Sequence, residues 1–320
     1  MNSAIELTVV VPMRNEAACI APLFARLLPI LESVTPRWEV ICVNDGSSDG
    51  TLDALKSANA EDSRVRVIDL SRNFGKEAAL TAGLDASSGD AVVPMDADLQ
   101  HPPELIPELM ARWRQGFDVV LARRRSRDTD HRVRGMLSRG YYRLHNLLSD
   151  TTLPEDVGDF RLLDRRVVEA VRRLPETHRF MKGIFAWVGF RTVIVEFDAD
   201  RRVTGKSRFG GRRLLSLALE GIVSFTTIPL RIWAYVGGLI SIVALVSAVW
   251  IVAKTLIFGT DLPRYPSLFT AILLLGGVQL IGIGVLGEYV GRIYGEVKRR
   301  PIYLVRERYG FPAADGSRND

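Results

Sequence analysis

The stretch of the sequence whose residues could most clearly do chemistry is VVPMDADLQHPPE, residues 92–104. The pattern predicts a short buried strand over 91–95, followed by an acidic turn that holds Asp96 and Asp98. Two carboxylates one residue apart, just past a strand, can bind one hard divalent ion, and Gln100 adds a neutral oxygen. Such oxygen ligands suit Mg²⁺ or Mn²⁺, which keep open positions for substrate phosphates. The alternative is an ordinary polar turn that caps the helix after it.

A second group of candidate residues consists of cations and hydroxyls that suit phosphate. Arg134 and Ser138 lie four residues apart on one face of a helix expected over 132–148, so both can grip one phosphate. The loop RRVTGKSRF, residues 201–209, is basic and contains a glycine, and such a loop could close over a diphosphate. The alternative for these arginines is a solvated basic surface.

Alternating apolar runs and helical patterns predict the elements that must position these residues. Strands are expected over 7–12, 39–43, 65–70, 91–95, 117–121 and 191–197. Helices of ten or more residues separate the first four strands, which predicts a parallel sheet with right-handed crossovers.

Ligands of parallel sheets bind beyond the carboxyl ends of the strands. The polar loops expected to converge there cover residues 12–16, 44–49, 69–73 and 96–100. Neither a G-x-G-x-x-G motif nor a P-loop follows any of the strands, which argues against these two classes of nucleotide-binding protein. A nucleotide held by carboxylates and a metal ion remains.

Composition and charge narrow the class further. The chain has 320 residues and a net charge of +5, and arginines crowd the stretch 112–213. A basic segment beside apolar spans favours phosphate or anionic lipid over nucleic acid as the ligand. The two cysteines, Cys19 and Cys42, form no disulfide framework or zinc motif, so a reducing compartment is expected. The N-terminus enters a strand directly, and no cleaved signal peptide is expected.

Two apolar runs near the C-terminus predict transmembrane helices. Residues 233–253 and 268–287 carry no charged side chain and are long enough to cross a bilayer. A pair of buried core helices is the alternative. Basic residues flank the pair on its outer sides, whereas the connection 259–267 has one arginine, which places both termini in the cytoplasm. The stretch 212–226 is predicted to be an amphipathic helix in the membrane interface.

Four motifs carry a family resemblance: VVVPMRNE, VNDGSSDGT, LSRNFGKEAAL and MDADLQHPPE. Together they resemble family 2 glycosyltransferases with the GT-A fold. The closer likeness is to polyprenyl-phosphate glycosyltransferases, which include dolichyl-phosphate mannose synthases and bactoprenol glucosyltransferases. The likeness covers residues 5 to about 305.

The resemblance implies an α/β architecture with a membrane anchor. A GT-A domain with a Rossmann-like, mostly parallel sheet would occupy residues 1–211, and an interfacial amphipathic helix residues 212–231. Two transmembrane helices, at about 233–255 and 268–289, would fall within 232–290. A cytoplasmic tail with a short strand, expected over 300–305, would cover residues 291–320.

The resemblance also assigns roles to individual residues. The nucleotide-sugar site would contain Pro12, Asn15, Glu16, Asp45, Asp69, Asp96, Arg202 and Ser207. The ligands of Mg²⁺ or Mn²⁺ would be Asp96, Asp98 and Gln100. The phosphate of the lipid acceptor would be bound by Arg124, Arg134 and Ser138. Ala122 stands where the family has a glycine two residues before this first arginine, and Arg208 stands where it has a lysine.

The stretch DVGDFRL, residues 156–162, holds the candidate catalytic carboxylate. By resemblance Asp159 takes this role, with Asp156 as the competitor. A lipid phosphate is already an anionic nucleophile at neutral pH, because its second pKa is about 6. Asp159 therefore either takes up a remaining proton as a base or orients the sugar hydroxyls.

The predicted function is that of a metal-dependent hexosyltransferase at the cytoplasmic face of the bacterial inner membrane, and the resemblance implies inversion. GDFRLLDRR and the paired apolar runs look most like the bactoprenol glucosyltransferases, hence UDP-glucose as donor and undecaprenyl phosphate as acceptor. GDP-mannose, or an aminoarabinose donor, is the alternative within the class. A homo-oligomer, such as a tetramer, is expected, and no nucleic-acid partner.

The sequence also bears on two functions outside this class. A processive polysaccharide synthase would need more spans and a Q-x-x-R-W-type acceptor motif, and the chain has neither. A non-catalytic membrane scaffold is opposed by the intact carboxylates Asp96, Asp98 and Asp159.

Overall fold

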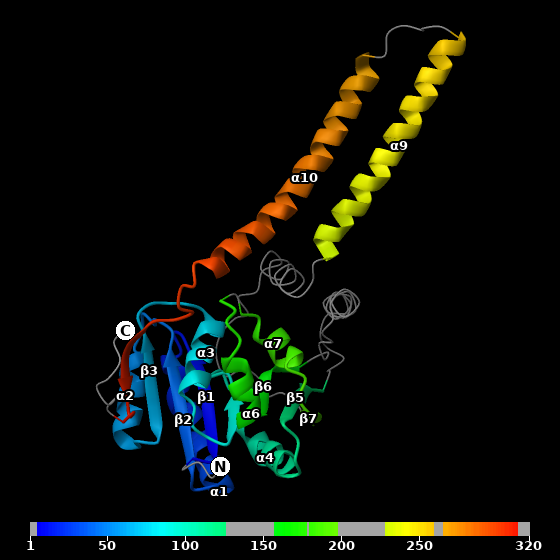
Figure 1. Ribbon diagram of the computed structural model, residues 1–320. Coiled ribbons are helices and arrows are strands. Elements are labelled where there is room, and N and C mark those ends of the chain that lie inside the picture. The colour runs from blue at the N-terminus through cyan, green and yellow to red at the C-terminus, as the bar shows by residue number, and fades with distance from the viewer. Residues whose placement is uncertain (1–4, 126–156, 178, 198–227, 259–264, 313–320) are drawn as a thin grey trace.

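The computed structural model describes residues 5–125, 157–177, 179–197, 228–258 and 265–312. Figure 1 shows an α/β domain from which two long helices, α9 (Ile228–Phe258) and α10 (Tyr265–Val297), extend side by side. After α10 the chain returns to the α/β domain as strand β8 (Val305–Tyr309). The α/β domain is therefore built from segments on both sides of the helical hairpin.

One eight-stranded sheet forms the centre of the α/β domain. The other strands are β1 (Leu7–Met13), β2 (Trp38–Asn44), β3 (Val65–Leu70), β4 (Ala91–Pro94), β5 (Val119–Arg124), β6 (Val157–Asp164) and β7 (Thr192–Phe197). Their spatial order is β7-β5-β6-β4-β1-β2-β3-β8. β1 pairs in parallel with β2 and β4, β2 with β3, and β5 with β7, whereas β6 and β8 pair antiparallel with their neighbours. The mostly parallel α/β sheet predicted from the apolar runs is confirmed.

Helices cover both faces of the sheet. They are α1 (Ala17–Val34), α2 (Thr51–Glu61), α3 (Lys76–Ala86), the 3₁₀ turn η1 (Pro103–Leu105), α4 (Ile106–Arg114), α6 (Arg165–Arg172) and α7 (Met181–Trp187). Because successive strand residues point to opposite faces, Val9 and Val10 of β1 join different core clusters. Val9 packs with Leu23 of α1 and Leu109 of α4, whereas Val10 packs with Leu80 of α3.

Strand β6 is the main difference from the pattern-based prediction. Its sequence, VGDFRLLD, contains three charged side chains, which argue against a strand inside a sheet. It nevertheless runs antiparallel between β4 and β5, with Leu163 opposite Val92 of β4. The antiparallel direction places Asp159, near the start of β6, at the sheet edge where β4 ends.

The C-terminal tail contains a strand, but it begins later than predicted. The expected strand over 300–305 is replaced by β8, which pairs antiparallel with β3. Tyr309 lies opposite Val67, and the backbone N–H of Ser71 donates to Leu304 O at 2.9 Å. β8 therefore covers what would otherwise be an open edge of the sheet.

The two apolar runs predicted to cross a membrane form helices α9 and α10, which are longer than the runs themselves. Large apolar side chains on both helices face outward: Tyr235, Trp250 and Leu280 are each more than 70% exposed. Gly282 of α10 faces α9, because a Cβ there would lie 3.5 Å from the ring of Trp233. The helices predicted over 132–148 and 212–226 lie outside the described residues.

Within the described residues, α1 is the one helix that meets a length and hydropathy test for a membrane span. Its apolar side chains Leu23, Leu27 and Leu31 are fully buried in the core of the α/β domain. This packing accounts for its hydropathy, since a core helix meets the same test.

Candidate functional site

The candidate site lies at the edge of the sheet where the parallel strands end. The loops after β1, β2, β3 and β4 all begin at this edge, because these four strands are parallel. Asp45, Asp69 and Asp96 stand at or just after the last residues of β2, β3 and β4. The convergence of polar loops predicted from the strand pattern is therefore present.

Lys76 connects the two carboxylates on which the predicted chemistry rests. Its Nζ lies 2.6 Å from Asp96 Oδ1 and 2.7 Å from Asp159 Oδ2. Lys76 is the first residue of α3, Asp96 follows β4 and Asp159 belongs to β6. The fold thus brings three residues from distant parts of the chain to one ammonium-centred cluster, the Lys76 cluster (Lys76, Asp96 and Asp159).

Asp159 is a buried but ionised carboxylate. Burial by itself raises the pKa of Asp159, but the positive charges of Lys76 and Lys182 lower it to about 2. Its Oδ1 atom is buried and has no hydrogen-bond partner among the described residues. This ionised oxygen lies at the edge of the sheet where the parallel strands end. Because it lacks a described partner, it can accept a hydrogen bond from a substrate hydroxyl.

Arg161 adds a second cation near Asp159, and this one is buried. Its Nη2 donates to Gly158 O at 2.6 Å, and its guanidinium lies 4.5 Å from the ring centroid of Phe185. Burial lowers the pKa of Arg161 to about 10, against the opposing charges of Asp159 and Glu77, so it stays charged at neutral pH. The charge of Asp159 is therefore compensated from both sides.

The Asp96–Gln100 turn has a defined conformation. Leu99 has a φ of 59°, in the left-handed region, and the backbone N–H of Gln100 donates to Asp98 Oδ1 at 3.1 Å. The backbone N–H of Asp96 donates to Nδ1 of His101 at 3.4 Å. Burial lowers the pKa of His101, which agrees with a neutral ring whose Nδ1 accepts.

His101 also joins this turn to β6. Its ring stacks on that of Phe160, with centroids 5.0 Å apart and an interplanar angle of 15°. Because Phe160 is the neighbour of Asp159 in β6, the stack helps to fix the turn relative to Asp159.

Two of the predicted nucleotide-site residues hold the loops after β1 and β2 together. Asn15 has a φ of 55°, and its Oδ1 accepts from the backbone N–H of Ser48 at 2.8 Å. Ser47 Oγ accepts from the backbone N–H of Asn15 at 3.0 Å. The backbone N–H of Glu16 donates to Thr51 Oγ1 at 2.9 Å, at the start of α2.

Asp45 and Asp69 are buried and engaged with other parts of the protein. Asp45 accepts from the backbone N–H groups of Phe74 at 2.7 Å and of Gly75 at 3.0 Å. Asp69 accepts from Asn44 Nδ2 at 2.7 Å and from Arg306 of β8 at 3.5 Å. Asp45 therefore fixes the loop that ends at Lys76, which is a positioning role rather than a free ligand position.

The remaining predicted site residues divide into three sets. Pro12 lies near the end of β1, opposite Val43, at the same edge as the residues above. Arg124 ends β5 opposite Phe197, and its side chain lies outside the described part of the chain. Those wholly outside it are Arg134, Ser138, Asp156, Arg202 and Ser207.

The donor atoms at the Asp96–Gln100 turn decide whether the predicted metal ion fits. Among the residues that the structure describes, no three His, Cys, Asp or Glu side chains lie close enough together to hold a metal ion by themselves. Asp96 and Asp98 with the Gln100 amide form a small oxygen set, which suits Mg²⁺ or Mn²⁺ that takes its other ligands from substrate phosphates and water. The residues present therefore fit such an ion only together with a phosphate ligand.

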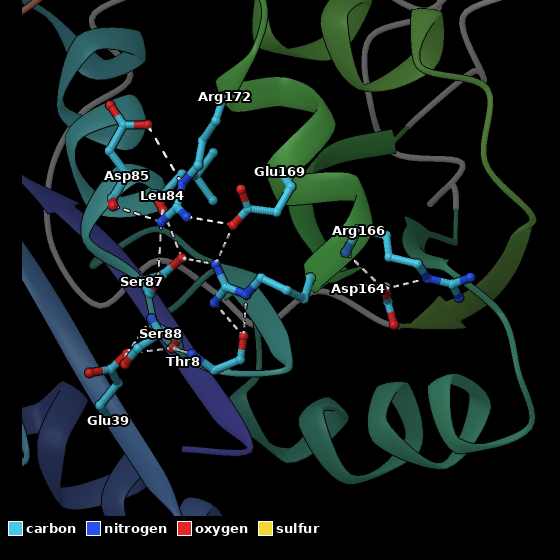
Figure 2. A network of polar contacts seen from close by, with 12 residues as sticks. Thr8, Glu39, Leu84, Asp85, Ser87, Ser88, Asp164, Arg166, Glu169 and Arg172 are labelled. Carbon is cyan, nitrogen blue, oxygen red and sulfur yellow. Dashed lines mark hydrogen bonds and ion pairs between the residues drawn. The ribbon is translucent and has the colours of Figure 1, made fainter. Parts of the chain in front are cut away.

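The opposite end of α3 is anchored by the network in Figure 2. Arg172 Nη2 donates to the carbonyl oxygens of Leu84, Asp85 and Ser87 at 2.7, 2.6 and 3.0 Å, and so caps the C-terminus of α3. Below it, buried Glu39 accepts from Thr8 and from Ser88. The helix that carries Lys76 at one end is thereby fixed at the other.

Sequence reasoning missed Lys76, His101 and Arg161 as site residues. Lys76 and His101 stand inside two of the quoted motifs, LSRNFGKEAAL and MDADLQHPPE, and that position was the available signal. What the motifs lack is the pairing of β6 with β4, which brings Asp159 to Lys76.

Comparison with known proteins agrees with this arrangement. Residues 8–172 match the family described as glycosyl transferase family 2, and residues 228–293 match the GtrB C-terminal hairpin. The chain is 49% identical over 307 residues to an uncharacterized glycosyltransferase of Synechocystis sp., with 96% of each chain covered. It is 47% identical over 305 residues to the SfII prophage-derived bactoprenol glucosyl transferase of Shigella flexneri, with 95% of this chain and 98% of the relative covered.

One similar solved structure is that of the mannosyltransferase PcManGT from Pyrobaculum calidifontis in complex with GDP-Man and Mn²⁺. The TM-score is 0.46 and the sequence identity is 16%, and the match covers 93% of this chain and 84% of the mannosyltransferase chain. The family matches and the two relatives confirm the resemblance carried by the four sequence motifs. The chain belongs to glycosyl transferase family 2 and carries a GtrB-type C-terminal hairpin.

Proposed function

We propose that this protein transfers a hexose from a nucleotide-diphosphate sugar to a polyprenyl phosphate. The observation that carries the proposal is the Lys76 cluster at the carboxyl edge of the sheet, in a chain 47% identical to a bactoprenol glucosyl transferase over almost its full length. That relative's name gives glucose and bactoprenol, and with the sequence resemblance we take UDP-glucose as the first donor to test and undecaprenyl phosphate as the first acceptor.

The donor half of the site is formed by the loops after β1, β2 and β4. Asp96, Asp98 and Gln100 would hold Mg²⁺ or Mn²⁺, which supplies positive charge to the leaving diphosphate. The chain's own residues orient the donor: the Asn15–Ser48 contact fixes the loops beside the nucleotide, and Asp45 fixes the loop before α3. Positioning of this kind supplies much of the rate in transfer reactions.

The acceptor half of the site contains Asp159, for which we propose an orienting role. A carboxylate with a pKa of about 2 is a weak base at neutral pH, and a phosphate acceptor with a second pKa of about 6 is already anionic. We propose that Asp159 Oδ1 instead accepts a hydrogen bond from a hydroxyl of the donor sugar, which its lack of a described partner supports, while Lys76 holds Oδ2. The acceptor phosphate then attacks the anomeric carbon from the face opposite the diphosphate, which gives inversion.

The membrane attachment is proposed to be the hairpin of α9 and α10. Their outward-facing side chains are large and apolar, as lipid contact requires, and each helix exceeds the about 20 residues that span a bilayer. Arginines and lysines outside the hairpin support a topology in which the α/β domain and both termini lie in the cytoplasm, at the inner membrane of a bacterium. The expected homo-oligomer, with a tetramer as candidate, stays a prediction.

The test is transfer of radiolabel to undecaprenyl phosphate by the full chain in detergent with Mg²⁺, from UDP-glucose and GDP-mannose in parallel. Labelled lipid from UDP-glucose alone is the expected result. Label from GDP-mannose alone would keep the proposed reaction and correct the donor. No labelled lipid from either sugar nucleotide would reject both the proposed reaction and the proposed donor. An Asp98→Ala variant should lose transfer, and Glu61→Gln, on the exposed end of α2, is the matched control.

A further inference from the structure

We propose that Lys76 competes with the divalent cation for Asp96, so that metal binding requires displacement of the Lys76 ammonium. The inference rests on the proposed function, because it takes Asp96 as a metal ligand. Nζ of Lys76 lies 2.6 Å from Asp96 Oδ1, as close as an ion pair permits. Two cations at one carboxylate oxygen repel each other strongly, so the ammonium and the metal ion exclude one another there.

Lys76 has a second carboxylate to which it remains bound. Its contact with Asp159 Oδ2 is 2.7 Å long, so the ammonium can leave Asp96 without losing its charge compensation. The side chain of Lys76 is 44% exposed, whereas that of Asp159 is 14% exposed, so the lysine has room to move and the aspartate has little. Displacement therefore changes one contact of Lys76 and keeps the other.

The main chain on which Lys76 stands cannot follow the side chain. Asp45 holds the backbone N–H groups of Phe74 and Gly75, and Arg172 caps the far end of α3. Between these anchors α3 packs tightly on β1, because a Cβ added at Gly83 would lie 2.2 Å from Val10 Cγ1. The exchange is therefore a movement of the lysine side chain alone.

This arrangement predicts an order of binding. In the free enzyme the ammonium neutralises Asp96 and keeps the affinity for a divalent ion low. A nucleotide diphosphate brings negative charge, which offsets the repulsion between the ion and Lys76. Lys76 thus acts as a positioning residue that makes metal binding depend on the donor, so that the ion and the diphosphate enter together.

The experiment is a titration of the purified full chain with Mn²⁺, followed by electron paramagnetic resonance, with and without UDP. Lys76→Met removes the charge at similar length and should bind Mn²⁺ at least about tenfold more tightly than the wild type without UDP. With UDP present, the difference should shrink to less than about threefold. Lys76→Arg keeps the charge and should restore the weak binding of the wild type.

Lys182→Met is the matched control, because Lys182 lowers the pKa of Asp159 yet has no described ion pair with Asp96. Unchanged or weaker Mn²⁺ binding by Lys76→Met would overturn the exchange, as would an equal gain in Lys182→Met. If Lys76→Met has a lower melting temperature, Lys76→Gln provides the same test with a polar side chain.

Failure of the exchange and failure of the proposed function give different results. Wild-type sugar transfer with unchanged Mn²⁺ affinity in Lys76→Met would reject the exchange alone. Equal Mn²⁺ affinity in Asp98→Ala and the wild type would reject the metal site itself, and with it the exchange.

Discussion

At the scale of single residues, Asp159 illustrates how neighbours decide what a carboxylate can do. Its pKa of about 2 keeps the group charged throughout the neutral range. A carboxylate whose pKa is lower in the folded than in the unfolded state stabilises the fold at pH values above its unfolded pKa. This stabilisation is lost as the pH falls through the folded pKa. For Asp159 that loss falls between about pH 4 and pH 2, well below the range of activity assays.

We therefore expect no limb from Asp159 in the pH dependence of kcat/KM between about pH 5 and pH 8. Asp159→Asn should lower kcat by about 100-fold at every pH in this range, because the buried acceptor loses its charge. The measurement is kcat/KM against pH for the wild type and the variant. An acidic limb near neutrality that is present in the wild type and absent in Asp159→Asn would identify Asp159 as a general base instead.

Asp45 makes the second prediction at this scale. Asp45→Ala leaves the backbone N–H groups of Phe74 and Gly75 without their acceptor in a partly buried place, which should cost about 1–3 kcal/mol of stability. Activity should fall further than stability does, because the same loop sets the position of Lys76. Thermal unfolding in detergent and transfer kinetics at a temperature where the variant is folded separate the two effects.

Asp45→Asn, which keeps one acceptor oxygen, is the conservative comparison and should lie between the wild type and Asp45→Ala. Equal activity of Asp45→Ala and the wild type would show that the loop keeps its conformation without these hydrogen bonds.

At the scale of elements, α3 transmits position from one end of the domain to the other. Arg172→Met removes three hydrogen bonds to the carbonyl oxygens at the C-terminus of α3 and should lower stability by about 1–3 kcal/mol. Arg173→Met is the matched control, since Arg173 is the exposed neighbour. The two variants are compared by thermal unfolding and by KM for the donor. A loss of stability as large in Arg173→Met would show that the effect is one of net charge.

The elements also show where sequence reasoning works and where it ends. The central parallel strands were predictable because strands covered on both faces read as continuous apolar runs, such as LTVVVPM in β1. Strand β6 was not predictable in this way, because Asp159 and Arg161 are buried through contacts with partners far away in the sequence. The site followed the same rule: the carboxylates were visible as motifs, whereas Lys76 gained its role from a contact 83 positions away.

At the scale of the whole molecule, one contact ties the end of the helical hairpin to the α/β domain, and a second holds the strand that follows the hairpin. The carboxylate of Glu296, near the end of α10, accepts from the backbone N–H of Thr177 at 3.0 Å. Farther along, Arg306 Nη2 of β8 donates to Ser71 O at 2.6 Å, beside the loop after β3. The end of α10 and the strand that follows it are thus both held against the α/β domain.

A chain that ends at Leu304 lacks β8 and should expose the edge of β3. We expect a melting temperature lower by about 4–8 °C, from a loss of about 2 kcal/mol, and a greater tendency to aggregate. A chain that ends at Pro312 keeps β8 and serves as the control. The readouts are thermal unfolding and size-exclusion chromatography in detergent. Equal melting temperatures for the two chains would mean that β8 adds nothing to the stability of the sheet.

The position of β8 also has a consequence for synthesis at the ribosome. Domains generally fold as units as they are synthesised, beginning from the N-terminus, yet the strand that covers β3 follows both long helices in the chain. The edge of the sheet therefore stays open until residues 305–309 have left the ribosome, by which time the hairpin has been made. Pairing of β8 with β3 therefore occurs only in chains whose hairpin has been made. A chain interrupted within the hairpin exposes the uncovered edge of β3 to the quality-control machinery of the cell.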